Sequence, residues 1–226
     1  MAGSTSARLA GGRTRLSRES ILDRYIELAD RSGGTEVSLR ALGESMGVDP
    51  TAVYRHFRSK DELLTAVTDR LLAGVVDAFE PTGDWRLDLR ALALLTRGVY
   101  LSHPRLARLL AHSPSSHPSN ASLIEACLAA LRSAGLGDAD AAAAVELMEN
   151  YVAGVSSLNA EMGDAEDGAW RRELAALPPV RYPHVTAVAD RLYRGDDRNF
   201  EFGLDLILDG LEARAGLISS LPARGP

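Results

Sequence analysis

The chain has 226 residues, of which 46% are hydrophobic and 25% are charged, and its formal net charge is −6. This composition is that of a globular protein long enough to bury a sizeable core in one or two domains. The negative net charge excludes a protein that coats nucleic acid or an anionic membrane with its whole surface. No run approaches the roughly 18 apolar residues of a membrane-spanning helix, so we expect no membrane partner.

The basic residues are concentrated near the N-terminus. Residues 1–60 contain ten Arg or Lys and seven Asp or Glu, a net charge of +3, whereas residues 61–226 contain 15 and 24, a net charge of −9. A local excess of cationic side chains is what attraction to DNA phosphates requires. The single cysteine, Cys127, rules out an intramolecular disulfide and fits a reducing compartment. We therefore expect a cytoplasmic protein in which this thiol is buried and inert.

The first 16 residues are predicted to form a flexible basic arm. They combine Gly and Ser with Arg8, Arg13 and Arg15, contain no acidic residue and lack the apolar core of a secretory signal. Arms of this kind reach the minor groove beside a DNA-binding domain in other proteins. The sequence leaves open whether this one does.

A first helix is expected to begin after Ser17, which is a good N-cap. Its apolar stripe includes Ile21 and Tyr25, and Gly33 and Gly34 are expected to end it.

Residues 38–60 have the pattern of two short helices joined by a tight turn. Three apolar residues recur at helical spacing in the first of them: Leu39, Leu42 and Met46. Gly47 supplies the backbone freedom that ends a helix. Asp49 is then a good N-cap, and Pro50 has its φ already set for a first helical position.

The second of these helices, eight residues long, has only a thin apolar face made by Val53 and Phe57. Its other side chains point elsewhere: Thr51, Ala52, Tyr54, Arg55 and His56. A helix that exposes so much beside so small a buried face is typical of a helix-turn-helix, whose second helix enters a DNA major groove.

A long helix follows. Ser59 and Glu62 have the spacing of a capping box, and Pro81 ends the helical pattern. Its apolar residues recur at spacings of three and four: Leu63, Leu64, Val67, Leu71, Val75 and Phe79. One end touches the motif and the other leaves it, so we expect this helix to link the two parts of the protein mechanically.

The motif resembles the N-terminal DNA-binding domain of the tetracycline-repressor (TetR) family. The likeness covers about residues 17–72 and keeps in register the pattern VSLRxLxxxMGVxxxAVYRHFRSKDELL. It implies an all-α fold in which an N-terminal three-helix helix-turn-helix domain, residues 17–62, is joined by the long helix to a C-terminal helical domain. That second domain, residues 63–226, is expected to bind a ligand and to dimerise.

The resemblance also implies which residues contact DNA. Tyr54 and Lys60 match positions that contact phosphates, with His56 beside them, and Arg40 matches a position that can reach a base edge. The full set of predicted DNA-binding residues is Ser38, Arg40, Thr51, Ala52, Tyr54, Arg55, His56 and Lys60. Family members often carry a small or polar residue in place of Arg55, so whether this arginine reads a base or binds a phosphate stays open.

Physical reasoning independently favours phosphate at two of these positions. Ser38 and Lys60 lie where helices are expected to begin, and free N–H groups and the helix dipole attract anions there.

From residue 84 onward every segment has a helical pattern, and no period-two strand is apparent. The predicted helices span about residues 84–103, 105–112, 120–134, 138–162, 170–177, 184–193 and 197–215. Two of them, 138–162 and 197–215, carry the stripes expected to form a two-fold dimer interface by resemblance to the family: Val145, Val152, Val155, Phe200, Leu204, Ile207, Leu208 and Leu211. The alternative is that both stripes pack only within the subunit.

A small-molecule pocket is implied among the C-terminal helices, where polar or aromatic residues stand among apolar ones. The candidates are Trp85, Tyr100, His103, His112, Met148, Asn150, Tyr151 and Trp170. Asn150 is the most suggestive, because a buried amide needs a partner. For each candidate the alternative is a surface or interface residue. The spacing of His103, His112 and His117 does not resemble a metal-ligand set, so we expect neither metal nor other cofactor.

An enzyme is the main alternative from another class. The sequence has no Gly-rich phosphate loop, nucleophile elbow or zinc-binding His pair. A helical small-molecule-binding protein or enzyme with a vestigial helix-turn-helix is the remaining alternative. We therefore predict a sequence-specific DNA-binding transcriptional regulator and not an enzyme, in the form of a ligand-released homodimeric repressor on a palindromic operator.

Overall fold

The computed structural model describes residues 16–32, 37–112, 117–161, 164–192 and 196–220. Every regular element in these ranges is an α-helix, which confirms the predicted all-α fold. The helices are α1 (Arg18–Arg31), α2 (Leu39–Ser45), α3 (Pro50–Tyr54), α4 (Lys60–Ala78), α5 (Trp85–Ser102), α6 (Ala107–His112), α7 (Pro118–Ser133), α8 (Asp138–Glu161), α9 (Asp164–Ala175), α10 (Pro183–Val188) and α11 (Asp197–Ser220).

The predicted arm, apart from Leu16, and the Gly33-Gly34 pair lie outside the described residues. The helix expected at 170–177 was misplaced, because the chain is already helical from Asp164. None of the helices in the described ranges is long and apolar enough to cross a membrane.

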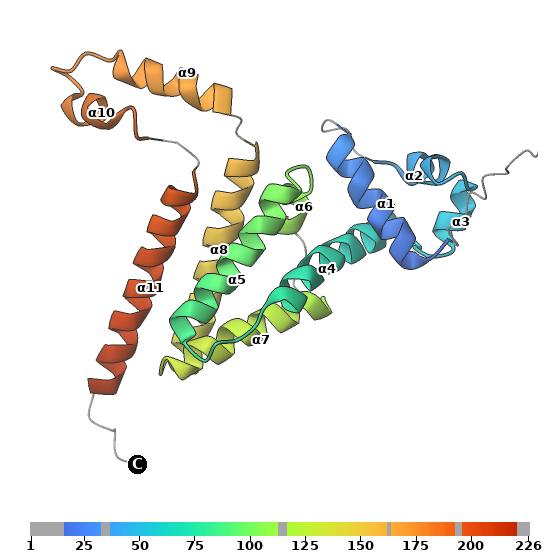
Figure 1. The fold of residues 1–226 in the computed structure, drawn as a ribbon, viewed down its shortest axis with the longest axis horizontal. Helices are drawn as coiled ribbons and strands as arrows, with labels where there is room; N and C mark the ends of the chain where they lie inside the picture. The colour runs from blue at the N-terminus through green and yellow to red at the C-terminus, as the bar shows by residue number, and fades with distance from the viewer. Residues whose placement is uncertain (1–15, 33–36, 113–116, 162–163, 193–195, 221–226) are drawn as a thin grey trace, which may run out of the picture.

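The helices form a small group at one end and a larger body (Figure 1). Helices α1–α3 lie at the right of that view, and α4 runs from them into the body. Helices α5 and α7 pack beside α4, and α8 packs against α5 and α7. Helix α11 lies along α8, while α9 and α10 pack against one another above it.

Side chains at the predicted caps start the first four helices. The hydroxyl of Ser17 accepts a hydrogen bond from the backbone N–H of Ser20, and Ser59 accepts one from Glu62. The predicted capping box at Ser59 is only half formed, because the Glu62 carboxylate instead accepts from the N–H of Arg58 at 2.8 Å.

The core of the small group continues into the body. Six fully buried residues form its centre: Ile21, Leu42, Val53, Phe57, Leu63 and Val67. The same cluster includes Tyr100 at the end of α5 and Leu106 and Leu110 near α6. Because this core is closely packed, a shift of α5 or α6 would displace the core residues of the helices that hold the helix-turn-helix.

A second core joins α5, α7, α8 and α11. Leu89, Leu131, Leu204 and Leu208 are fully buried in it. At the contact between α8 and α11, the rings of Tyr151 and Phe200 stack with centroids 5.3 Å apart. The Tyr151 hydroxyl also donates a hydrogen bond to the backbone oxygen of Phe200 at 2.7 Å. The Tyr151 side chain therefore holds α11 against α8 by two contacts.

A buried carboxylate closes the loop between α4 and α5. Asp88 accepts hydrogen bonds from the backbone N–H and the hydroxyl of Thr82, both at 2.7 Å, and from the N–H of Gly83. Burial acts to raise the pKa of Asp88, but these hydrogen bonds outweigh it and the pKa lies below its ordinary value.

Candidate DNA-binding surface and ligand cavity

The turn between α2 and α3 depends on two glycines. Gly47 has φ +66°, the left-handed conformation that ends α2 as predicted. Gly43 lies where the two helices cross: a Cβ there would stand 3.1 Å from Cα of Pro50 and 3.3 Å from the oxygen of Val48. Both neighbours are backbone atoms, so a larger residue at position 43 would require the turn or the start of α3 to shift by a few tenths of an ångström.

Helix α3 is shorter than predicted, with five residues that end at Tyr54. It buries Val53, and Phe57 is buried just beyond it, as the sequence pattern indicated. Tyr54 is 52% exposed, Thr51 and Arg55 are exposed, and Ala52 and His56 are partly buried. The guanidinium of Arg18 on α1 holds this segment, since it donates to the His56 oxygen at 2.9 Å and lies over the Phe57 ring.

Thr51 and Arg40, both predicted to bind DNA, already have side-chain partners. The hydroxyl and the N–H of Thr51 both donate to Asp49, and these bonds lower the pKa of that carboxyl. Arg40 pairs with Glu44 one turn along α2 at 2.9 Å, although the Arg40 side chain is 82% exposed. An ion pair this exposed is weak, so Arg40 can leave Glu44 for a stronger anion.

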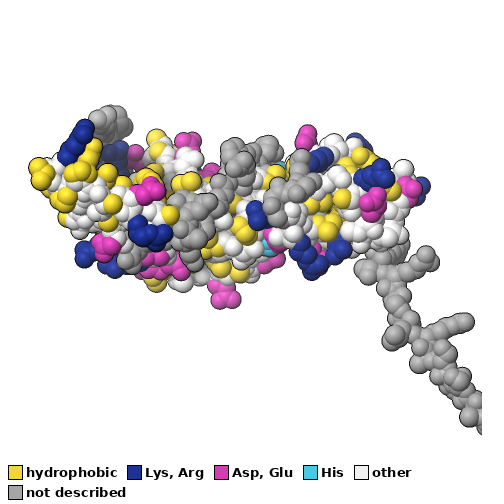
Figure 2. All heavy atoms as spheres, turned by 90° about the horizontal axis from the view of Figure 1, so that it is seen from above, with side chains coloured by type: hydrophobic (Ala, Val, Ile, Leu, Met, Phe, Trp, Pro, Cys, Tyr) yellow, Lys and Arg dark blue, Asp and Glu magenta, His cyan; other side chains and the backbone are white. Residues whose placement is uncertain are grey.

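Ser38 and Lys60 lie at helix N-termini as expected. Ser38 is exposed and caps α2, and Lys60 is the first residue of α4. In the view from above, Lys and Arg side chains, with acidic ones among them, lie at the end of the molecule where α1–α3 lie and also at the opposite end (Figure 2).

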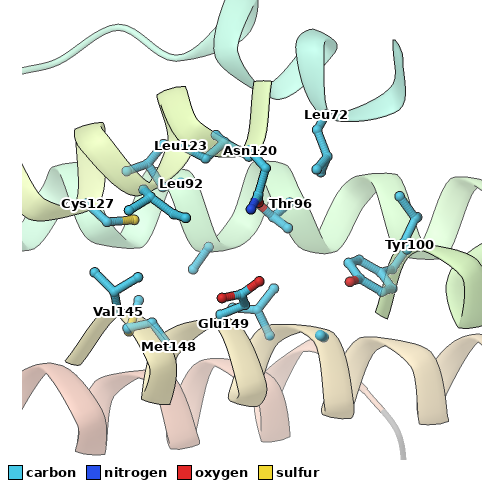
Figure 3. Close-up of a pocket in the computed structure, with 15 residues that line it drawn as sticks. Leu72, Leu92, Thr96, Tyr100, Asn120, Leu123, Cys127, Val145, Met148 and Glu149 are labelled. Carbon is cyan, nitrogen blue, oxygen red and sulfur yellow. The ribbon is translucent and has the colours of Figure 1, made fainter. Parts of the chain in front are cut away.

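A cavity of about 100 Å³ lies between α5, α7 and α8. Leu72 of α4 and Leu110 of α6 also line it. Most of the lining is Ala, Val, Ile, Leu and Met, and its polar members are Thr96, Tyr100, Asn120, Cys127 and Glu149. Figure 3 shows these groups directed into one space. Burial first, and then the Glu149 carboxylate, raise the pKa of the Cys127 thiol to about 11, which agrees with the expected inert thiol.

Of the predicted ligand-binding residues whose side chains the structure describes, Tyr100 and Met148 line this cavity and the others do not. Asn150, the favoured candidate, is exposed, so the prediction of a buried amide was wrong. Successive side chains on a helix point about 100° apart. The residue of α8 that lines the cavity is therefore Glu149, the neighbour of Asn150.

The other candidates lie elsewhere in the described structure. Trp85 packs against the second core, Tyr151 binds α11, and Trp170 on α9 is 44% exposed. His103 lies between the two parts of the molecule, where its Nδ1 is 2.8 Å from Oδ2 of Asp30 on α1. The side chain of His112 lies outside the described residues.

Sequence reasoning missed four polar cavity residues: Thr96, Asn120, Cys127 and Glu149. A usable signal was present on α8, where Glu149 interrupts an apolar stripe of Val145, Met148 and Val152 at helical spacing. The convergence of α5, α7 and α8 on one space could not be read from local pattern.

The predicted dimer stripes also require correction. Five of their residues are buried within the subunit's own second core: Val152, Phe200, Leu204, Leu208 and Leu211. Val145 lines the cavity, and Val155 and Ile207 are partly buried beside the same core. Among the described side chains of these two helices, the large apolar ones that are exposed are instead Leu147, Leu158, Phe202 and Leu206.

Helix α3 is short and exposed, belongs to a helix-turn-helix, and is linked by α4 to a helical body with a cavity. This arrangement is typical of helix-turn-helix transcriptional regulators. The chain belongs to the TetR family. Residues 21–67 match the family model for bacterial regulatory proteins of the tetR family, and residues 79–215 match that for the tetracyclin repressor-like C-terminal domain. The protein is thus a DNA-binding transcriptional regulator and not an enzyme, as predicted.

Relatives and solved structures span nearly the whole chain. The HTH-type transcriptional repressor DrrR1 of Streptomyces coeruleorubidus is 28% identical over 89% of this chain and 79% of its own length. The structure of ActR from Streptomyces coelicolor in complex with actinorhodin superposes with a TM-score of 0.77 at 28% identity, covering 89% of this chain and 99% of that one. The structure of BioQ with its double-stranded DNA operator superposes with a TM-score of 0.63 at 27% identity, covering 88% and 99%.

Proposed function

We propose that this regulator is a cytoplasmic repressor that binds a palindromic operator as a homodimer and leaves it when a small molecule fills the cavity. The observation that carries the proposal is the surface of α3, which buries Val53 alone and exposes Tyr54 and, at its end, Arg55. The complexes of BioQ with its operator and of ActR with actinorhodin are consistent with both halves of the proposal.

The proposed DNA contacts divide into two kinds. Tyr54, His56, Ser38 and Lys60 bind phosphates, the last two at helix N-termini where the dipole favours an anion. Thr51, Ala52, Arg55 and, once released from Glu44, Arg40 face the base edges. Phosphate contacts set position on the DNA, and base contacts set sequence preference.

The proposed dimer face lies on α8 and α11. Leu147 and Leu206 are 50% and 57% exposed, and both line a shallow groove between these helices. A second copy placed on this groove by a two-fold axis buries the same residues on both sides. Two copies of α3 set about 34–36 Å apart then meet successive major grooves.

Three contacts connect the cavity to the DNA-binding end. Leu72 of α4 lines the cavity directly. At the start of α7, the N–H of Ser119 donates to Asp69 of α4 at 2.9 Å. At the end of α5, His103 contacts Asp30 of α1 three residues after Tyr100. A ligand that moves α5 or α7 therefore moves α1 and α4, and DNA must weaken ligand binding by the same factor, commonly about 5- to 150-fold.

The test is fluorescence anisotropy with DNA from the intergenic region upstream of the protein's own gene and with scrambled DNA, at two salt concentrations. We expect specific binding that weakens with salt. Lys60→Ala should weaken binding to all sequences alike, whereas Arg40→Ala should cost about 1–3 kcal/mol and relax base preference. Arg132→Ala, an exposed arginine on α7, is the control. No preference for the upstream DNA by a folded protein would contradict the proposal for that promoter.

The dimer is tested separately by sedimentation velocity. Leu206→Glu should shift the protein toward monomer because it places a charge at the centre of an apolar interface. Leu94→Glu, at an exposed leucine of α5, should leave the assembly unchanged. Equal behaviour of the two variants would place the interface elsewhere.

A further inference from the structure

Among the described residues that line the cavity between α5, α7 and α8, the carboxylate of Glu149 is the one formal charge. None of these described lining residues is Arg, Lys or His, and no described cationic side chain forms an ion pair with Glu149. Figure 3 shows the carboxylate directed from α8 into the space that Thr96 and Asn120 face from the opposite side. Glu149 is an exposed residue, so its carboxylate keeps its charge, and beside this apolar lining it can bind a cation through a charge-assisted hydrogen bond.

A second polar group points into the same space. Tyr100 is only 5% exposed, and its hydroxyl is directed into the cavity (Figure 3) without a hydrogen bond to any described residue. Burial, and then the Glu149 carboxylate, raise its pKa to about 12, so the phenol is neutral at physiological pH. A neutral phenol can accept a hydrogen bond from an ammonium group, and its ring attracts a cation.

We propose that the effector is a compact lipophilic ammonium ion. Its ammonium group binds between Glu149 and the hydroxyl of Tyr100, and its apolar body packs on Leu92, Met148 and Val152. This assignment rests on the proposed ligand-released function and adds the chemical class of the ligand.

The size and the surrounding charge agree with this class. An apolar cavity of roughly 150 Å³ holds a benzene ring, so a cavity of about 100 Å³ is smaller than a ring requires and suits a short alkyl body. Residues 61–226 carry a net charge of −9, which raises the local concentration of cations and opposes anions. An organic anion would meet Glu149 directly and find no compensating cation on the described lining.

The test uses three probes that share a butyl chain and differ in the end group: butylamine, 1-butanol and pentanoate. Isothermal titration calorimetry of the full chain at pH 7.5 measures their affinities. We expect the amine to bind about tenfold more tightly than the alcohol, since Glu149 is partly solvated and its charge is screened. The carboxylate should bind more weakly than the alcohol.

Matched variants assign the effect to the two groups. Glu149→Gln should remove the advantage of the amine and leave the affinity for the alcohol unchanged. Glu146→Gln, one turn earlier on α8 and absent from the cavity lining, should change neither. Tyr100→Phe should weaken the amine about threefold and the alcohol less, because a charge-assisted hydrogen bond is the stronger one.

The outcomes separate this inference from the proposed function. Equal affinity for amine and alcohol, preference for the carboxylate, or no amine binding at millimolar concentration would overturn the cation site even if the protein binds operator DNA. An advantage of the amine over the alcohol that Glu149→Gln removes supports the site. If the amine then fails to release DNA, the cation site stands and only the release step of the proposed function fails.

Discussion

Gly203→Ala is expected to break the Tyr151–Phe200 contact that holds α11 against α8. A Cβ at Gly203 would lie 2.2 Å from the hydroxyl oxygen of Tyr151 and 2.8–2.9 Å from two of its ring carbons. Ordinary contacts are longer than about 3.4 Å, so the ring must move by roughly 1 Å or more. That ring is held on both sides, by its stack on Phe200 and by the hydrogen bond to the Phe200 oxygen.

The magnitude follows from what the displaced ring loses. The hydrogen bond contributes about 1 kcal/mol and the aromatic pair about 1 kcal/mol. Alanine returns about 1 kcal/mol through its higher helix propensity. We therefore expect Gly203→Ala to lower the free energy of unfolding by about 1 kcal/mol.

The sign should reverse once the ring is absent. In a Tyr151→Ala background the clash cannot occur, and Gly203→Ala should raise the free energy of unfolding by about 1 kcal/mol, a coupling of about 2 kcal/mol. Gly98→Ala, at an exposed helical glycine of α5 with no atom within 4 Å of its Cβ position, should stabilise in both backgrounds.

The assay is urea-induced unfolding followed by circular dichroism at one protein concentration, because dimerisation would make stability depend on concentration. An effect of Gly203→Ala with the same sign in both backgrounds would refute the steric argument. It would mean that α11 can shift along α8 without lowering the free energy of unfolding.

Two further predictions concern the DNA-binding end and the loop before α5. Gly43→Ala should weaken operator binding about tenfold or more with little change in helix content, because its Cβ would push Pro50 and thus α3 away from α2. Fluorescence anisotropy measures this affinity, and an unchanged affinity would contradict the prediction. Asp88→Asn should cost about 1–3 kcal/mol at pH 7. The folded pKa of Asp88 is lowered, so this contribution is present above the ordinary carboxyl pKa of about 3.9 and is lost as the pH falls through the folded pKa. Urea midpoints of variant and parent should therefore converge at low pH, and a constant difference would oppose the reasoning.

The sequence alone determined the helical fold and the helix-turn-helix. These rest on local signals, which are complete within a few residues: Asp49 and Pro50 start α3, Gly47 ends α2, and Ser59 starts α4. Local hydrogen bonds and backbone conformations of this kind are decided by near neighbours along the chain. These local features can therefore be predicted without knowledge of the tertiary contacts.

Only the tertiary structure decided which side of each C-terminal helix faces which neighbour. Long helices such as α8 and α11 are apolar on more than one side, and pattern alone does not separate a core stripe from an exposed one. Packing buried Phe200 and Leu204 within the subunit and left Phe202 and Leu206 exposed. It also turned Glu149, and not Asn150, toward the cavity, because a difference of one residue on a helix is a rotation of about 100°.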